Sequence, residues 1–258
     1  MKITVLAENT SDIPGIGCEH GLSLFIETMS KKILFDTGQS NLFEKNAEKL
    51  DIDLAMVDFA VLSHGHYDHS GGLKRFLEIN TTAPVYLSRY AFEPHYNADG
   101  KYIGVDESLS ENSRLVFTDE EYRIGEGLTL FSCNNRKRII DTDCAGLSTL
   151  ENGKLVPEDF RHEQYLLIEE NGKRILISGC SHKGIINIVN WFRPDTLIGG
   201  FHYMKLDPGD GLKAFAVRLN SYPTKYYTCH CTGIGQYEFI KPYIDDLEYI
   251  SSGRKIEL

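Results

Sequence analysis

Short apolar segments alternate with amphipathic segments along most of the chain. The apolar segments predict β-strands because they are short and rich in β-branched and aromatic residues. They cover residues 2–8, 22–29, 32–35, 59–62, 84–88, 114–118, 128–132, 164–169, 174–178, 194–202, 225–228 and 248–251. Segments with apolar residues at helical spacing predict α-helices. They cover residues 40–50, 71–80, 184–192, 210–221 and 235–245.

The second part of the chain repeats the order of the first. A predicted hairpin ends in Asp36-Thr37-Gly38, and a later hairpin with an Asn-Gly turn ends in Ser178-Gly179-Cys180. Two similar halves of alternating strands and helices predict a single α/β domain over residues 1–258. Its expected architecture is a four-layer αββα sandwich. The irregular segment from about residue 89 to 112 is expected to be an insertion over the active site.

A histidine-rich motif follows one of the predicted strands, in the run Ser63-His64-Gly65-His66-Tyr67-Asp68-His69-Ser70-Gly71-Gly72. Imidazole and carboxylate donors suit zinc, iron or manganese, whereas calcium and magnesium sites are built mainly from oxygen. His64 and His66 lie two residues apart at a strand end and can hold one ion together. Asp68 and His69 are adjacent and diverge. We therefore expect two ions that share one water.

At this motif the chain resembles the metallo-β-lactamase fold superfamily, whose hallmark is His-x-His-x-Asp-His after a strand. Further segments resemble one branch, described as similar to 7,8-dihydropterin-6-methyl-4-(β-D-ribofuranosyl)-aminobenzene-5'-phosphate synthase. They are residues 12–23, 35–38, 162–164, 178–182, 199–202 and 230–233. The resemblance implies that His162 is the third histidine of the first ion and His230 the last histidine, on the second ion. It also implies that Asp36 orients the ligand loop without binding metal.

The resemblance places Cys180 at the position of the carboxylate that bridges the two ions, where most two-metal relatives have Asp. Thiolate is a good zinc ligand but a poor bridging oxygen. Cys180 therefore either binds one ion, leaves the second site weak, or is a buried unreactive cysteine. His182 and His202 each follow an apolar strand. They could replace Cys180 as a ligand, contact the substrate, or be core histidines.

Three further polar residues have two interpretations each. Glu19 and His20 belong to a glycine-containing loop that precedes a predicted hairpin. They are expected either to line the site and contact the substrate or to form a solvated turn. His95 lies in the expected insertion, where a surface position or a contact with substrate is favoured over metal ligation.

Composition and charge narrow the possible partners. A hydrophobic fraction of 41% and a charged fraction of 25% are ordinary for a globular protein, and a net charge of −10 argues against nucleic-acid binding. No apolar run reaches the roughly 18 residues that span a bilayer, and the first residues do not resemble a signal peptide. The six scattered cysteines fit reduced thiols. We expect a cytoplasmic protein with a small-molecule substrate and no membrane contact.

Two divalent ions are expected as cofactors, with zinc favoured over manganese or iron. Zinc lowers the pKa of bound water from about 15.7 to about 7, so the centre is typical of a hydrolase. Asp68 would orient the resulting hydroxide while it binds the second ion. The expected substrate is a small ester, phosphoester or lactam.

The resemblance implies an alternative function, a synthase that transfers a dihydropterin group and releases pyrophosphate. The substrate would then be pterin-like and phosphorylated. Tyr90, Phe92, Tyr96 and Tyr102 could stack on a pterin or form a small core of their own. A second alternative is a non-hydrolytic protein, either a metal-binding sensor or a redox protein.

Overall fold

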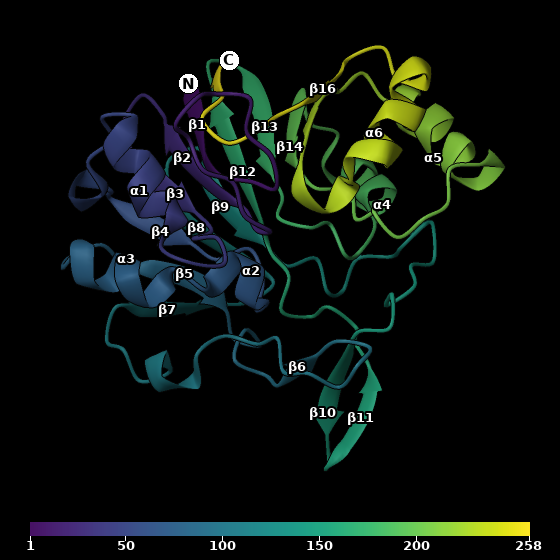
Figure 1. The fold of residues 1–258 in the computed structure, drawn as a ribbon. Coiled ribbons are helices and arrows are strands. Elements are labelled where there is room, and N and C mark those ends of the chain that lie inside the picture. Colours follow the sequence, from purple (N-terminus) through teal and green to yellow (C-terminus); the bar gives the residue numbers. More distant parts are fainter.

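The computed structural model describes residues 1–258 and contains two seven-stranded sheets that pack face to face (Figure 1). In spatial order, the first sheet consists of β17 (Lys255–Glu257), β1 (Lys2–Ala7), β2 (Ser23–Glu27), β3 (Lys32–Phe35), β4 (Phe59–Val61), β5 (Val85–Ser88) and β7 (Leu115–Thr118). The second consists of β16 (Leu247–Tyr249), β15 (Lys225–Thr228), β14 (Thr196–Gly199), β13 (Lys173–Ile177), β12 (Tyr165–Glu170), β9 (Leu128–Phe131) and β8 (Glu121–Gly125). A small third sheet consists of β11 (Lys154–Pro157), β10 (Ser148–Glu151) and β6 (His95–Tyr96).

Helices cover the outer face of each large sheet (Figure 1). The α-helices are α1 (Leu42–Lys49), α2 (Tyr67–Ser70), α3 (Leu73–Ile79), α4 (Ile185–Phe192), α5 (Asp210–Asn220) and α6 (Ile234–Ile240). Short 3-10 helices are η1 (Leu54–Met56), η2 (Glu107–Leu109), η3 (His230–Thr232) and η4 (Lys241–Tyr243). Helices α1 and α3 pack on the first sheet, and α4, α5 and α6 pack on the second. The predicted four-layer α/β sandwich is confirmed. None of these helices has the length and hydrophobicity that a bilayer crossing would require.

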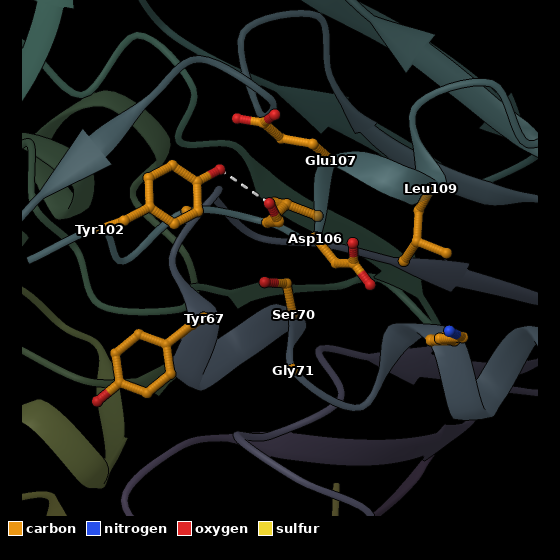
Figure 2. Close-up of a pocket in the computed structure, with 10 residues that line it drawn as sticks. Tyr67, Ser70, Gly71, Tyr102, Asp106, Glu107 and Leu109 are labelled. Atoms are coloured by element: carbon orange, nitrogen blue, oxygen red, sulfur yellow. Dashed lines mark hydrogen bonds between the residues drawn. The ribbon is translucent and has the colours of Figure 1, made fainter.

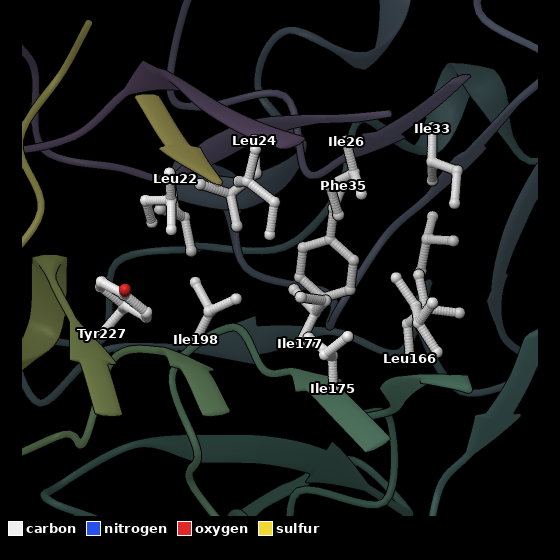
Figure 3. Close-up of a cluster of buried hydrophobic side chains, with 14 of the residues drawn as sticks. Leu22, Leu24, Ile26, Ile33, Phe35, Leu166, Ile175, Ile177, Ile198 and Tyr227 are labelled. Atoms are coloured by element: carbon white, nitrogen blue, oxygen red, sulfur yellow. The ribbon is translucent and has the colours of Figure 1, made fainter. Parts of the chain in front are cut away.

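The strands are apolar along their length because alternate residues serve two different cores. On β3, Ile33 and Phe35 point into the core between the sheets, whereas Leu34 packs against the helices outside. On β13, Ile177 faces the core between the sheets and Leu176 faces the helices. Successive side chains of a strand point to opposite faces, so a sheet covered on both sides needs a continuous apolar run. Figure 3 shows the core between the sheets.

The two halves share a topology that brings their strand ends together. In the first sheet β1, β2 and β3 are antiparallel, and β3, β4, β5 and β7 are parallel. In the second sheet β12 and β13 are antiparallel, and β13, β14, β15 and β16 are parallel. Parallel strands end at the same edge of a sheet, where ligand-binding loops gather. The residues directly after β3, β4, β13, β14 and β15 therefore form one rim.

Several elements differ from the sequence-based expectation. The strand β8 was not predicted because it is short, contains two charged residues and is only partly buried. The helix expected over 235–245 ends as α6 at Ile240 and continues as the 3-10 turn η4. The segment 89–112 contains β6, which pairs with β10, so this region is extended by the hairpin of β10 and β11.

Candidate metal centre

The loops that follow the parallel strands hold the predicted site residues in strained backbone conformations. Four non-glycine residues on this rim have positive φ angles: Asp36 (59°), Ser181 (59°), His202 (58°) and His230 (49°). Left-handed backbone is unfavourable for such residues and is retained mainly where the surrounding structure requires a particular side-chain direction. Because four such residues lie on one rim, we infer that the strained backbone is retained to direct their side chains toward a common site.

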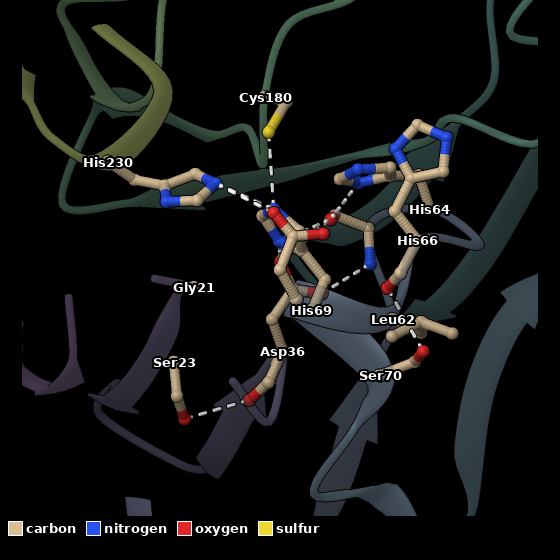
Figure 4. Close-up of polar contacts among 12 residues, drawn as sticks. Gly21, Ser23, Asp36, Leu62, His64, His66, His69, Ser70, Cys180 and His230 are labelled. Carbon is tan, nitrogen blue, oxygen red and sulfur yellow. Dashed lines mark hydrogen bonds and ion pairs between the residues drawn. The ribbon is translucent and has the colours of Figure 1, made fainter. Parts of the chain in front are cut away.

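Asp36 fixes the ring of His69, as Figure 4 shows. Its Oδ2 lies 2.7 Å from His69 Nδ1 and accepts a 2.7 Å hydrogen bond from Ser63 Oγ, while Oδ1 accepts the Ser63 amide at 2.7 Å. Carboxylates that hold one ring nitrogen of a histidine direct the other nitrogen toward a metal. The contact at Nδ1 leaves Nε2 of His69 free to face the centre. The orienting role that the resemblance implied for Asp36 would use this contact.

One group of potential ligands gathers around His69 Nε2. This atom lies 3.2 Å from Cys180 Sγ and 3.3 Å from His230 Nε2. His230 Nε2 in turn lies 3.2 Å from Asp68 Oδ2. A tetrahedral ion with bonds of about 2.0–2.1 Å places its nitrogen and oxygen ligands about 3.3 Å apart. The separations measured from His69 Nε2 and His230 Nε2 are therefore close to those between ligands of a zinc-sized ion, and Figure 4 shows Cys180 and His230 converging on His69.

The electrostatics of this group favour metal binding. Burial alone would raise the pKa of Asp68, but His69, His20 and His230 outweigh it and hold the pKa well below its usual range. Asp68 is therefore a carboxylate anion at neutral pH. His230 is oriented from outside, since its Nδ1 lies 2.8 Å from Asn9 Oδ1 and its amide donates to Glu8 Oε1 at 2.6 Å.

A second group of potential ligands consists of His64, His66 and His182, whose ligand atoms lie within 4.8 Å of one another. The Nε2 atoms of His64 and His182 are 3.3 Å apart, and His64 Nδ1 lies 2.8 Å from Ser63 Oγ. The His182 ring stacks on Phe160 with ring centroids 4.4 Å apart. Burial lowers the pKa of both His64 and His182 well below the usual value, so both rings are neutral and can offer a lone pair.

His162 belongs to a different cluster, centred on the buried carboxylate of Glu158. Glu158 Oε1 lies 2.5 Å from His162 Nε2 and 2.7 Å from His95 Nδ1, and Oε2 lies 3.3 Å from His66 Nε2. Burial would raise the pKa of Glu158, but the three imidazoles lower it. The Gly65 amide donates to His162 Nδ1 at 2.8 Å. That bond requires an unprotonated Nδ1, so a neutral His162 has its proton on Nε2, facing Glu158.

The other predicted residues lie at different distances from the centre. His20 reaches it from the solvent side, with Nε2 3.3 Å from Asp68 Oδ2. The Glu19 carboxylate instead accepts the amides of Gln39 and Ser40, each at 3.0 Å. His202 is next to the centre, because its ring centroid lies 4.3 Å from that of His182.

Sequence reasoning missed several residues at the centre. His95 is only 1% exposed, so the expectation of a surface position is wrong. Glu158 is 5% exposed and Glu8 is fully buried, although neither belongs to the histidine motif. A Glu four residues before His162 was the one available signal for Glu158. Cys231 directly follows the predicted ligand His230, whereas Glu8 had no comparable signal, because only the fold brings it to the centre.

Two pockets adjoin the centre. One, of about 570 Å³, lies beside α2 and is lined by Tyr67 and Ser70 on one side and Tyr102 on the other (Figure 2). The other, of about 350 Å³, is lined in part by His182 and His202. The second pocket therefore gives a small molecule access to His182 and His202, whereas the first lies beside the α2 residues that flank Asp68 and His69 in the sequence.

The fold and the centre define a class of proteins: two-sheet α/β sandwiches with buried clusters of metal-ligand side chains at one rim. The sequence model of the metallo-beta-lactamase superfamily matches residues 16–142. The chain is 31% identical over 240 residues to the uncharacterized protein MJ0448 of Methanocaldococcus jannaschii, covering 90% of each chain. The chain belongs to the metallo-β-lactamase superfamily.

Two further comparisons concern relatives with a described activity. Over 285 residues, 100% of this chain and 96% of the relative, it is 29% identical to the 7,8-dihydropterin-6-methyl-4-(beta-D-ribofuranosyl)-aminobenzene-5'-phosphate synthase of Methanocaldococcus jannaschii. The crystal structure of Tm1679, described as a metal-dependent hydrolase of the beta-lactamase superfamily, has a TM-score of 0.85 at 30% identity. The alignment covers 100% of this chain and 99% of that one.

Proposed function

We propose that this chain is a metal-dependent hydrolase with two zinc ions that acts on a small ester, phosphoester or lactam. The observation that supports this most is the pair of ligand groups on one rim, with separations near 3.3 Å between His69 and His230 and between His64 and His182. The similarity to a structure described as a metal-dependent hydrolase supports the same conclusion.

The proposed first ion is held by His64, His66 and His182. The proposed second ion is held by Asp68, His69, Cys180 and His230. Zinc ions in these positions would supply a Lewis acid and acidify water near neutral pH. Asp68 is ionised and 8% exposed, so it can orient a water molecule at the mouth of the centre while it binds the second ion. His20, on the solvent side of Asp68, can contact the substrate.

The test of this proposal is a hydrolysis screen. The purified chain would be incubated with small phosphodiesters, carboxylic esters, lactones and β-lactams, before and after metal removal and with zinc or manganese restored. We expect hydrolysis of at least one class that disappears with the metal and returns with zinc. The proposal fails if the zinc-loaded protein hydrolyses none of these classes faster than the metal-free protein.

The full-length similarity to a pterin synthase supports a second candidate, transfer of a dihydropterin group with release of pyrophosphate. The segment 89–112, which we propose forms a cover over the site, supplies Tyr102 to the pocket in Figure 2. Tyr96 packs edge-on against Tyr102, with ring centroids 5.7 Å apart. Release of pyrophosphate from a dihydropterin pyrophosphate donor and an aminobenzene ribofuranosyl phosphate acceptor would select this candidate.

Replacing His182 should remove one ion, whereas replacing His162 should not. Family resemblance assigns the first ion to His162, but His182 is the residue whose ligand atom lies near both His64 and His66. We expect His182→Ala to lose about one ion per chain by elemental analysis, because its neutral ring is a direct ligand. His162→Ala should keep both ions. The reverse result would support the assignment from resemblance.

Glu158 should strengthen metal binding without contacting the ion. Its Oε2 lies 3.3 Å from His66 Nε2, a contact that can orient the ring of this proposed ligand. Loss of a carboxylate in such a role costs about 10–100-fold in metal affinity. We expect Glu158→Gln to weaken zinc binding at one site by this factor in a chelator competition titration. Glu93→Gln, which alters a half-exposed pair with Arg161, is the control and should leave zinc affinity unchanged.

A further inference from the structure

A third cluster of metal-ligand side chains lies on the side of the centre formed by the second sheet. It consists of Cys180 after β13, His202 after β14 and Cys231 after β15, whose ligand atoms all lie within 4.8 Å of one another. Cys231 Sγ lies 3.4 Å from the carbonyl oxygen of Cys180. Each of three neighbouring parallel strands is thus followed by one metal-ligand side chain of this cluster. The two thiols are soft donors and the imidazole is a borderline donor. No sequence motif of adjacent cysteines produces this arrangement.

The imidazole of His202 is the part of this cluster that has no hydrogen-bond partner. Both ring nitrogens of His202 are buried and make no hydrogen bond, and Cys180 and Cys231 are each 3% exposed. Buried imidazole nitrogens without a partner are costly, since transfer from water is not compensated. A cation bound in this cluster would satisfy the ring nitrogen that faces the two sulfurs. His202 also has a positive φ of 58°, so the backbone is strained in the conformation that brings this ring to the two sulfurs.

The surrounding backbone leaves room for sulfur at this place. A Cβ atom at Gly200 would collide with Cys231 Sγ, so only glycine there allows the sulfur to occupy its position. Gly199, directly before it, has a φ of 148° and would bring a Cβ into the Ser178 carbonyl. Two glycines at the end of β14 therefore permit close approach of the neighbouring strand ends.

We propose that Cys180, His202 and Cys231 form a third metal site, which takes a thiophilic ion such as Zn²⁺ or Cu⁺. Two thiolates and one imidazole are the donors that such ions prefer over Mg²⁺, Ca²⁺ or Mn²⁺. Cys180 also lies 3.2 Å from His69 Nε2, so its sulfur connects this site with the proposed second ion. The proposal concerns metal binding and does not depend on which reaction the centre catalyses.

Cobalt substitution tests the proposal directly. The full chain would be stripped of metal under reducing conditions and reloaded with Co²⁺, and bound ions would be counted by elemental analysis. Thiolate bonds to Co²⁺ produce charge-transfer absorption in the near ultraviolet, whereas histidine and carboxylate bonds do not. We expect three ions per chain and strong charge-transfer absorption. In Cys231→Ser we expect two ions and loss of most of that absorption, because both cobalt–thiolate bonds of the third ion disappear and only the bond from Cys180 to the second ion remains.

Cys133→Ser is the matched control, because Cys133 is 2% exposed and belongs to no group of potential ligands. It should bind as many ions as the unaltered chain. His202→Ala provides an independent variant if Cys231→Ser does not fold. It should also lose one ion, together with that ion's two cobalt–thiolate bonds, and keep only the absorption of the bond from Cys180 to the second ion. Two ions in the unaltered chain, with a count and spectrum unchanged in both variants, would overturn the proposal. A protein that binds three ions but hydrolyses nothing would contradict only the proposed function.

Discussion

Replacing His230 by alanine should remove the second ion and lower hydrolytic activity by more than about a hundredfold. This loss is larger than the roughly 10–100-fold loss expected when a residue that only orients a ligand is replaced. The His230 side chain is 1% exposed, and its Nε2 lies between Asp68 Oδ2 and His69 Nε2. Without this ring, only Asp68, His69 and Cys180 are left to hold the ion. Elemental analysis and a rate measurement on the best substrate from the screen would check both effects.

His20→Ala is the matched control for this variant. His20 lies 3.3 Å from the same Asp68 oxygen, but its side chain is 45% exposed. We expect the His20 variant to keep both ions and to change the rate far less than the His230 variant. Full occupancy of both sites in His230→Ala would show that this histidine is not a ligand.

Replacing Phe35 by alanine should lower the free energy of unfolding by about 3–5 kcal/mol. Phe35 is fully buried between the two sheets, where Figure 3 shows its ring among aliphatic side chains from both. The truncation removes apolar contacts and leaves a cavity that the rigid sheets cannot close. Denaturant titration of the metal-loaded protein would measure the change.

Phe117→Ala, on β7 of the same sheet, provides the comparison because Phe117 is 46% exposed. We expect a change within about 0.5 kcal/mol, as for most surface positions. Equal losses in the two variants would mean that the core between the sheets contributes less to stability than its burial indicates.

The fold could be predicted from the sequence because its determinants are local. The apolar runs of β3 and β13 each serve two cores, and their lengths and flanking turns identify them as strands. The Asn171-Gly172 turn marks the second hairpin. The strand β8 was not predicted because its place in the sheet depends on pairing with β9, and the residues of β8 alone do not indicate that pairing.

The centre was only partly predictable for a related reason. The histidine motif specifies its own residues, and His230 and Cys180 follow strands that the apolar pattern identifies. Glu158 and His95 reach the centre through the small third sheet, whose strands are short and weakly apolar. Either His162 or His182 could face His64, depending on the orientation of the rings. The pattern of apolar and polar residues in the sequence does not indicate that orientation.

The parallel strands that end at one rim have a mechanical consequence. Asp68 and His69 belong to the first half of the molecule, and Cys180 and His230 belong to the second. Neither half alone therefore contains all the ligands of the proposed second ion. Sliding one sheet along the other by a single strand residue, about 3.3 Å, would move donors apart by a full ligand spacing. Metal affinity should therefore report how accurately the two halves are aligned.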